Sequence, residues 1–226
     1  MGSVPAICRR FAPLNPTTGS TLPQLRGIVF DVDGTLCLPQ NYMFSEMRES
    51  LGISKNIDIL HHIQQLPTAE ERVIAAEKIR SIERRAMQHQ QPQPGLIELM
   101  DYLQTRGVPT PVTRLLETFL PKHVFLPIIT RETPGLLPKP DPAGILHIAH
   151  EWGLGNRGES LIMVGDSIDD MTAGHTAGAA TVLLVNDHNS HLKEHAHTDL
   201  WIERLDELVG ILETGFVGQA VDRQID

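Results

Sequence analysis

Two carboxylates, Asp31 and Asp33, follow the short apolar run at 27–30 and are separated by one residue. An apolar run that ends in a turn residue is typical of a buried parallel strand. Open α/β sheets place their chemistry just beyond the carboxyl ends of such strands, so both acids stand where a site is expected. Because both point the same way from the strand, they repel each other unless a cation lies between them. Mg²⁺ prefers oxygen ligands, and the two acids can then act as a nucleophile and a general acid–base.

Two later segments place a lysine and further acids beside expected elements. The segment 139–142 reads KPDP, in which Lys139 precedes a helix that we expect Asp141 to cap. The apolar run at 161–164 ends in the segment 165–170, GDSIDD, where Asp166 and Asp170 are four residues apart. This spacing brings both carboxylates toward one face as the chain turns into a helix, whereas Asp169 is expected at the surface.

These three segments resemble three motifs of the haloacid dehalogenase-like (HAD) hydrolase superfamily. They follow the order of that family over residues 27–186: DVDGT at 31–35 resembles the first motif, DxDx[TV], KPDP resembles the third and GDSIDD the fourth. The resemblance implies an α/β fold with a doubly wound parallel sheet, the HAD-like Rossmannoid core, and a small α-helical cap. It points to the phosphoglycolate phosphatase-like type within the superfamily.

The resemblance also implies a role for each matching residue. Asp31 would attack the substrate phosphorus and form an aspartyl-phosphate, and Asp33 would protonate the leaving oxygen and then activate water. The second acid favours phosphoryl transfer, because dehalogenases of the superfamily do not carry it. Lys139 would bind the phosphoryl oxygens and pair with Asp31, and Thr35 would add a substrate-binding hydroxyl. The cofactor implied is Mg²⁺, held by Asp31, Asp33, Asp166 and Asp170.

The expected function is hydrolysis of a small phosphomonoester, with a small phosphorylated metabolite as the partner. Two alternatives remain open at this point. One is a catalytically impaired family member that acts as a binding protein, and the other is a phosphomutase that uses the same aspartyl-phosphate. The substrate and the oligomeric state are not specified by the sequence.

Helical and strand patterns divide the chain into a core and an insertion. We expect tails at 1–22 and 217–226, an α/β core at 23–36 and 95–216, and a helical cap at 37–94. In the cap the expected helices span 42–51, 57–65 and 68–90, the last opened by a capping box at 68–71. In the core we expect helices at 95–106, 113–120, 142–152 and 169–177 and strands at 127–130, 161–164 and 181–185.

One strand of the expected core is missing near residues 107–112. This segment, GVPTPV, has two prolines in six residues, which cannot serve as a central strand because proline donates no ladder hydrogen bond. In the HAD family a strand here delivers the Ser or Thr of the second motif. Thr113 and Thr130, each followed by arginine, are the candidates to replace it. The loss of a central strand motivates the binding-protein alternative.

Composition excludes several classes of partner. The net charge of −9 argues against a nucleic-acid backbone, and no apolar run reaches the roughly 18 to 20 residues that a membrane span needs. Cys8 and Cys37 form no zinc or disulfide framework, which favours a reducing, cytoplasmic location. Mitochondrial targeting is the weaker alternative: the first 30 residues hold three arginines and no acid, but four prolines break any long helix there.

Two further groups of residues are expected to have structural roles. The histidines at 188, 191, 195 and 197 have a spacing that could hold a transition metal, but a solvated surface segment is the preferred interpretation. Trp152 and Trp201 are expected to anchor the core, and Cys37 to pack near the hinge of the cap.

Overall fold

The structure is a computed structural model of the 226-residue chain, and it describes residues 10–14, 21–87, 89–108, 127, 129–130 and 133–217. The chain divides into two compact units. One unit spans Cys37–Gln91 and is inserted into the other, which runs from the N-terminus to Leu36 and resumes at Pro92. No helix of the described residues is long and apolar enough to cross a membrane.

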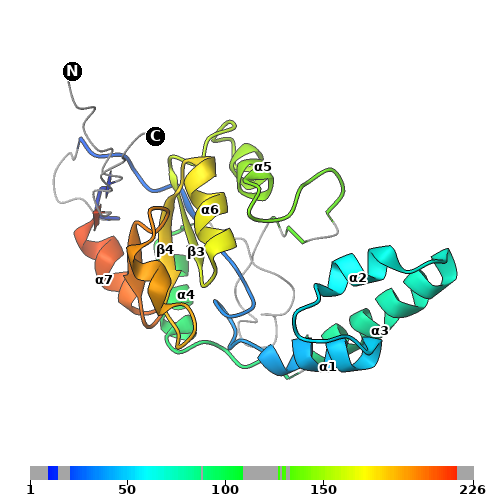
Figure 1. Ribbon diagram of the computed structural model, residues 1–226. Helices are drawn as coiled ribbons and strands as arrows, with labels where there is room; N and C mark the ends of the chain where they lie inside the picture. The colour runs from blue at the N-terminus through cyan, green and yellow to red at the C-terminus, as the bar shows by residue number, and fades with distance from the viewer. Residues whose placement is uncertain are drawn as a thin grey trace, which may run out of the picture. The chain divides into compact units, whose positions relative to one another are not determined.

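The larger unit is built on a four-stranded parallel sheet (Figure 1). Its strands lie in the order β2 (Gly27–Phe30), β3 (Leu161–Gly165), β4 (Ala180–Leu184) and β5 (Leu200–Ile202). All residues of β2, β3 and β4 are buried, as expected for strands covered on both faces. The predicted parallel α/β sheet is therefore confirmed.

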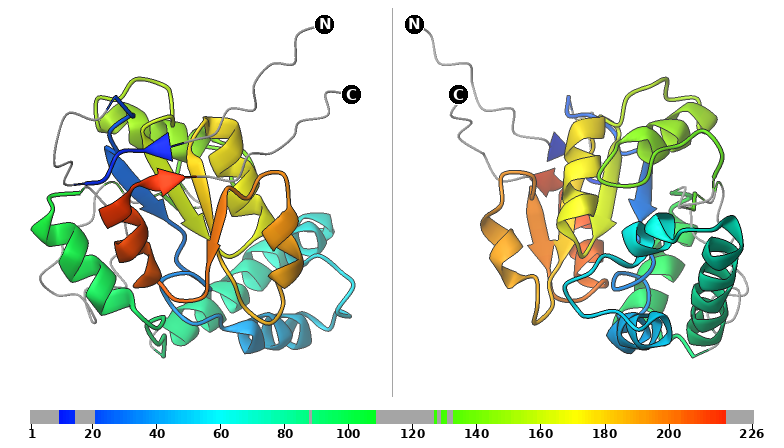
Figure 2. Two further views of the ribbon diagram at one scale, coloured as in Figure 1. Left: turned by 90° about the vertical axis from the view of Figure 1, so that its left-hand side faces the viewer. Right: turned by 45° about the vertical axis from the view of Figure 1, so that its right-hand side comes forward.

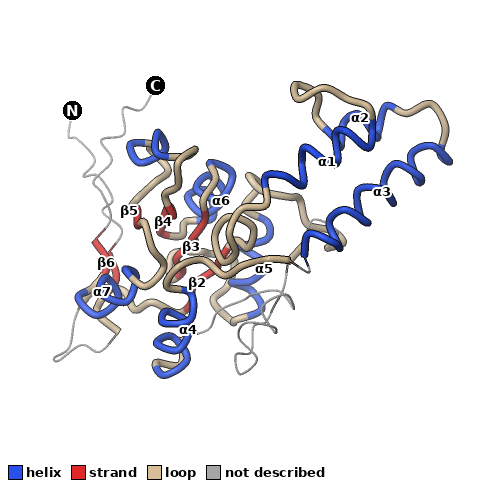
Figure 3. The backbone as a smooth tube through the Cα atoms, turned by 90° about the horizontal axis from the view of Figure 1, so that it is seen from below, coloured by secondary structure: helices blue, strands red, loops and turns tan. Residues whose placement is uncertain are grey.

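Helices cover both faces of this sheet (Figure 3). On one face α5 (Ala143–Glu151) and α6 (Ile168–Ala177) pack into a core that includes Val29 and Met163. On the other face lie α4 (Leu96–Thr105) and α7 (Glu207–Thr214), which contact each other. Alternate residues of each strand thus serve two cores, which is the doubly wound arrangement.

Several small elements complete the larger unit, and the sequence did not predict them. A two-residue strand β1 (Arg10–Phe11) pairs antiparallel with β6 (Phe216–Val217), as Figure 2 shows. The rings of Phe11 and Phe216 meet edge to face, 6.0 Å between centroids. The 3₁₀ helix η2 (Ser190–Glu194) precedes β5. β5 and α7 were also missed, because their short apolar runs carry little periodic signal.

The inserted unit consists of three helices, as predicted: α1 (Asn41–Leu51), α2 (Ile59–Gln65) and α3 (Ala69–Met87). They pack around Met47, Ile59, Ile79 and Ile82. The predicted capping box is present, because the Thr68 hydroxyl accepts from the Glu71 backbone and the Glu71 carboxylate accepts from the Thr68 N–H. Cys37, the first residue of this unit, is fully buried.

Strand β2 ends the sheet within the part of the chain that the structure describes. Residues 109–126, which include Thr113 and the predicted helix 113–120, lie outside that part. The predicted strand at 127–130 is not formed at its described residues. The backbone of Thr130 is engaged in a local turn instead: its N–H donates to the Thr133 hydroxyl and its carbonyl accepts from the Thr133 N–H.

The two tryptophans differ. Trp152 packs against the α5–α6 core, as predicted. Trp201, in contrast, is 36% exposed, and the prediction that it anchors the core is wrong. Trp201 lies in β5, the last strand of the described sheet, and the Lys193 ammonium stands 3.7 Å from its ring centroid. The ring therefore serves as a cation–π partner at the edge of the sheet.

Two helical glycines should respond to alanine in opposite directions. A Cβ on Gly174 in α6 would stand 2.8 Å from Met163 and Thr181, whereas a Cβ on Gly210 in α7 would meet nothing within 4 Å. We expect Gly174→Ala to destabilise the protein by about 1–3 kcal/mol through overpacking. Gly210→Ala should stabilise it by about 0.5–1 kcal/mol, because alanine favours the helix. Urea unfolding of both variants checks this, and equal effects would show that α6 does not approach the sheet closely.

Candidate active site

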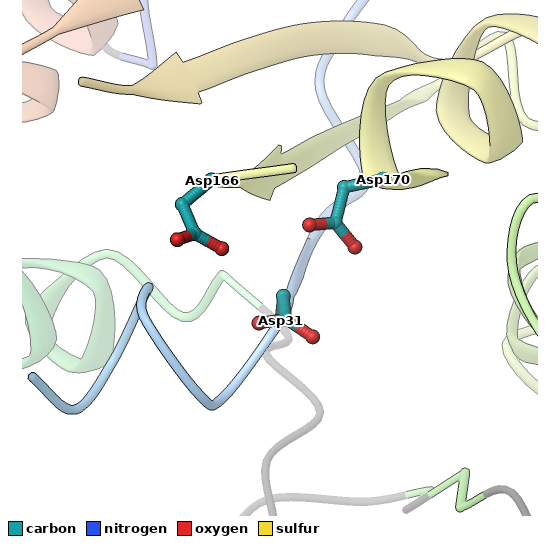
Figure 4. A group of neighbouring side chains, drawn as sticks. All are labelled: Asp31, Asp166 and Asp170. Atoms are coloured by element: carbon teal, nitrogen blue, oxygen red, sulfur yellow. The ribbon is translucent and has the colours of Figure 1, made fainter. Parts of the chain in front are cut away.

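Three carboxylates meet at the carboxyl edge of the sheet (Figure 4). Asp31 follows β2, Asp166 follows β3, and Asp170 lies in the first turn of α6. Because Phe30 and Val164 are paired in register, the two strands end side by side. Each residue offers one carboxylate oxygen, and these oxygens all lie within 4.8 Å of one another. The structure thus brings together three of the four acids that the sequence predicted as metal ligands.

Local structure explains why each carboxylate is held there. The Asp31 N–H donates to the Val164 carbonyl over 2.9 Å and continues the β2–β3 ladder into the site. Ser167 caps α6 in a capping box with Asp170, whose side chain accepts from both the N–H and the hydroxyl of Ser167. Asp170 is consequently 1% exposed. The β2–β3 ladder and the α6 cap thus hold two of the three carboxylates at this edge of the sheet.

Gly34 is required by the close approach of the first motif to Asp166. Its φ of +89° lies in the left-handed region, and a Cβ there would stand 2.3 Å from the Asp166 Oδ2. Any side chain at position 34 would therefore displace the Asp166 carboxylate. Gln93 holds this turn with two hydrogen bonds. Its side-chain amide donates to the Gly34 carbonyl over 2.7 Å, and its backbone N–H donates to the Leu36 carbonyl.

Lys139 is the cationic partner of the acidic group. Its ammonium lies 2.5 Å from the Asp31 Oδ1 and 2.5 Å from the Asp170 Oδ1. The lysine is delivered by the segment before α5, where the Asp141 carboxylate accepts from the Ala143 N–H, as the predicted cap requires. The sequence-predicted pairing of Lys139 with Asp31 is thus present in the structure.

The negative charge of the acids is only partly offset by Lys139. Burial, followed by the charge of Asp170, raises the pKa of Asp31 to about 6 although Lys139 opposes the shift. Burial, followed by the charges of Asp31, Asp170 and Asp33, raises the pKa of Asp166 to about 7. Burial alone would lower the pKa of Lys139, but Asp170 and Asp31 outweigh it and the pKa is raised. One ammonium does not offset this group of acids, so the donor set fits a hard divalent cation.

The other two predicted residues of the first motif lie close by but differ in exposure. Asp33 is half-buried and near enough for its charge to raise the pKa of Asp166. Thr35 is fully buried, and its hydroxyl has no hydrogen-bond partner among the described residues. The hydroxyl that the sequence assigned to substrate binding is therefore covered in this arrangement.

Sequence reasoning missed two asparagines after β4, Asn186 and Asn189. The Asn186 side chain reaches the Asp166 carboxylate, and the Asn189 side chain reaches the Asp166 backbone carbonyl. The available signal was their position, because residues after the carboxyl end of a parallel strand adjoin the site built on the neighbouring strand.

The histidine segment is only partly the solvated surface that was predicted. His188 and His191 are exposed, whereas His195 and His197 are half-buried. The His197 ring stacks on His175 of α6, 4.4 Å between centroids, and meets His195 edge to face at 4.9 Å. Packing against α6 could not be read from the segment alone, because His175 lies 22 residues before His197 in the chain.

Replacing Asp166 should stabilise the protein when no metal is present. An unfolded aspartate titrates near a pH of about 4, so the folded chain holds this proton more tightly and loses stability as pH rises from about 4 to about 7. At pH 8 with EDTA, Asp166→Asn should gain about 1 kcal/mol or more, roughly 2–4 °C in melting temperature. The gain should shrink at pH 5, where Asp166 is protonated in the wild type.

Calorimetry with Asp169→Asn as the control tests this, since Asp169 is an exposed acid of the same helix. Added Mg²⁺ should raise the melting temperature of the wild type and of the control, but not that of Asp166→Asn. A variant that is less stable than the wild type at pH 8 would contradict the assigned repulsion.

Comparisons with known proteins agree with this geometry. A family model described as haloacid dehalogenase-like hydrolase matches residues 45–178. An uncharacterised hydrolase of Saccharomyces cerevisiae is 44% identical over 206 residues, covering 85% of this chain and 93% of that protein. A haloacid dehalogenase-like hydrolase domain-containing protein of Arabidopsis thaliana is 31% identical over 221 residues, covering 88% of each.

Solved structures share the fold at low identity. A predicted phosphoglycolate phosphatase from Haemophilus somnus has a TM-score of 0.65 at 19% identity, covering 83% of this chain and 97% of that one. A β-phosphoglucomutase from Clostridium difficile has a TM-score of 0.64 at 16% identity, covering 82% and 93%. With the motifs, the parallel sheet and the acidic site in place, the family match and the close relatives show that this chain belongs to the haloacid dehalogenase-like hydrolases.

Proposed function

We propose that this hydrolase is an Mg²⁺-dependent phosphatase, which cleaves a small phosphomonoester through an aspartyl-phosphate on Asp31. One observation carries the proposal. The Asp31 carboxylate stands at the end of β2 beside two further carboxylates, and its Oδ1 is held by the Lys139 ammonium. A nucleophilic carboxylate can approach an anionic phosphate only where cations offset the repulsion between them, and this site is arranged for that purpose.

Asp31 supplies the nucleophile in this scheme. Because Lys139 binds its Oδ1, the carboxylate keeps a fixed orientation and the other oxygen remains available for attack on phosphorus. The new bond joins a carboxylate oxygen to phosphorus, and the bond from phosphorus to the ester oxygen breaks. Lys139 gives two of its three N–H groups to Asp31 and Asp170, and it offers the remaining one to a phosphoryl oxygen.

Asp33 transfers a proton in both steps, first as an acid and then as a base. It stands two residues beyond Asp31, and the family resemblance implies that it is the general acid and base of the reaction. In the first step it gives its proton to the leaving ester oxygen, so that an alcohol departs. In the second it takes a proton from water as the water attacks the phosphorus of the aspartyl-phosphate. Inorganic phosphate leaves, and both aspartates return to their starting states.

The residues that would hold Mg²⁺ are Asp31, Asp166 and Asp170, with the Asp33 backbone carbonyl as the family resemblance implies. When bound, the ion would offset negative charge and orient the phosphoryl oxygens. Asp170 has both carboxylate oxygens engaged already, one by Lys139 and the other by Ser167. We therefore assign a supporting or water-bridged role to Asp170, and the main ligand role to Asp166 together with the Asp31 oxygen that does not attack phosphorus.

The three-helix unit is the segment to which we assign substrate selection. In the sequence this unit begins at Cys37, shortly after the first motif, and the chain returns to the larger unit at Pro92. The family resemblance implies a helical cap, and such a cap would exclude water and recognise the alcohol part of a phosphorylated metabolite.

Turnover should depend on both the metal and Asp31. We expect hydrolysis of p-nitrophenyl phosphate with Mg²⁺, and loss of activity to background with EDTA or with Asp31→Asn, because no carboxylate then attacks phosphorus. Asp169→Asn, which removes an exposed acid, should keep wild-type activity. Folding of each variant is checked by circular dichroism. A folded wild type without turnover across a panel of phosphomonoesters would contradict the proposal and favour the binding-protein alternative.

Asp33→Asn should separate the two steps of the reaction. Loss of the proton donor and base should lower kcat by about 10²–10⁴-fold. An activated ester such as p-nitrophenyl phosphate needs little protonation of its leaving group, so the phosphorylated enzyme should form but hydrolyse slowly. Mass spectrometry after rapid quenching should then find phosphate on the peptide that contains Asp31. Phosphate found on a residue other than Asp31 would overturn the covalent mechanism. So would a kinetic burst of p-nitrophenol without any phosphate on the enzyme.

A further inference from the structure

The loop that follows β4 lies beside the candidate metal ligand Asp166. The Asn186 Nδ2 stands 3.2 Å from the Asp166 Oδ2. The Asn189 Nδ2 stands 2.7 Å from the Asp166 backbone carbonyl and 2.9 Å from the Leu184 carbonyl. One residue of the site is therefore held at two points, by its carboxylate and by its backbone, from a single neighbouring loop.

Hydrogen bonds within the loop determine which way each amide faces. The His188 N–H donates to the Asn186 Oδ1 over 2.9 Å, so the Asn186 oxygen is engaged and its NH₂ group is the one that faces Asp166. The Asn186 N–H donates to the Asn189 Oδ1 over 2.7 Å, which orients the second amide in the same way. Both amides thus present donors to Asp166, with no ambiguity between oxygen and nitrogen.

These contacts differ in what they constrain. Asn189 is 6% exposed and ties the loop to β4 and to the backbone of Asp166, which makes it a structural brace. Asn186 is half-buried, and its contact is with the side chain whose oxygens would bind a cation. A neutral donor on one oxygen restricts the rotation of the carboxylate without competing for positive charge.

We propose that Asn186 is a positioning residue, which holds the Asp166 carboxylate in the orientation that receives the divalent cation. The inference rests on the proposed metal site but adds a residue outside the three motifs. Ligating carboxylates are themselves hydrogen-bonded, and loss of such a partner typically costs about 10–100-fold in metal affinity. Asn186 touches neither substrate nor reacting atoms in this role, and its effect is exerted through Asp166.

Direct metal binding tests the proposal without turnover. The free Mn²⁺ signal in electron paramagnetic resonance gives the dissociation constant of the substrate-free protein. We expect Asn186→Ala to raise that constant by about 10-fold or more. Asn186→Ser should give the same loss, because a serine hydroxyl can still accept from the residue-188 N–H but is too short to reach Asp166. His188→Ala, an exposed change in the same loop, should bind as the wild type does.

Kinetics add a second readout. If Asn186 acts on metal binding alone, the Mg²⁺ concentration for half-maximal activity should rise by a similar factor in Asn186→Ala. At saturating Mg²⁺, kcat and the KM for p-nitrophenyl phosphate should return to within about threefold of the wild type, because the contact then matters less than the metal–carboxylate bond itself. Loss of kcat that no Mg²⁺ concentration restores would overturn a positioning role through the metal.

The outcomes separate this inference from the proposed function. Wild-type Mn²⁺ affinity in either folded Asn186 variant would overturn the inference but not the proposed function. In particular, normal binding by Asn186→Ser would show that the structure of the loop matters and the contact with Asp166 does not. A wild-type protein that binds no Mn²⁺ overturns the metal site together with the inference. A third outcome is possible: the wild type binds Mn²⁺, both Asn186 variants bind it more weakly, and the wild type hydrolyses no phosphomonoester. This outcome would support the inference and contradict the proposed function.

Discussion

Electrostatic repulsion among carboxylates at the carboxyl edge of the sheet is the constraint on which the rest of this structure depends. Asp31, Asp166 and Asp170 each bring one carboxylate oxygen within 4.8 Å of the others, and the pKa values of Asp31 and Asp166 rise to about 6 and 7. Without contacts that hold them, these three side chains would turn toward solvent. They stay together because Lys139 bridges two of them and because the local backbone leaves them few other positions.

The scaffold resists this repulsion with short-range backbone devices. The β2–β3 register aligns the two strand ends, the capping box orients Asp170, and the left-handed turn at Gly34 lets the first motif pass against Asp166. Asn186 and Asn189 add a brace from the loop after β4. Repulsion at the site thus lowers the stability of the fold, and packing in the surrounding cores offsets this loss, which is a common relation between function and stability.

Hydrolysis places different demands on the two units. The larger unit carries every residue to which we assign chemistry, whereas the three-helix unit has its own core around Met47, Ile59, Ile79 and Ile82. A helical unit that folds around its own core can vary its surface without disturbing the acids of the larger unit. This separation agrees with the proposal that the three-helix unit selects the substrate, because the motifs of the larger unit do not specify it.

The sequence by itself determined the family and the identity of the three acids that meet at the sheet edge, because DVDGT, KPDP and GDSIDD are local signals that need no knowledge of the fold. The helices with strong apolar periodicity and the capping box at Thr68 followed in the same way. Only the tertiary structure decided several further contacts: Lys139 with Asp170, Asn186 with Asp166, and His197 with His175. It also placed Trp201 at an exposed edge and engaged Thr130 in a turn rather than a strand. Contacts between residues far apart in the chain depend on sheet order and register, and no local pattern contains that information.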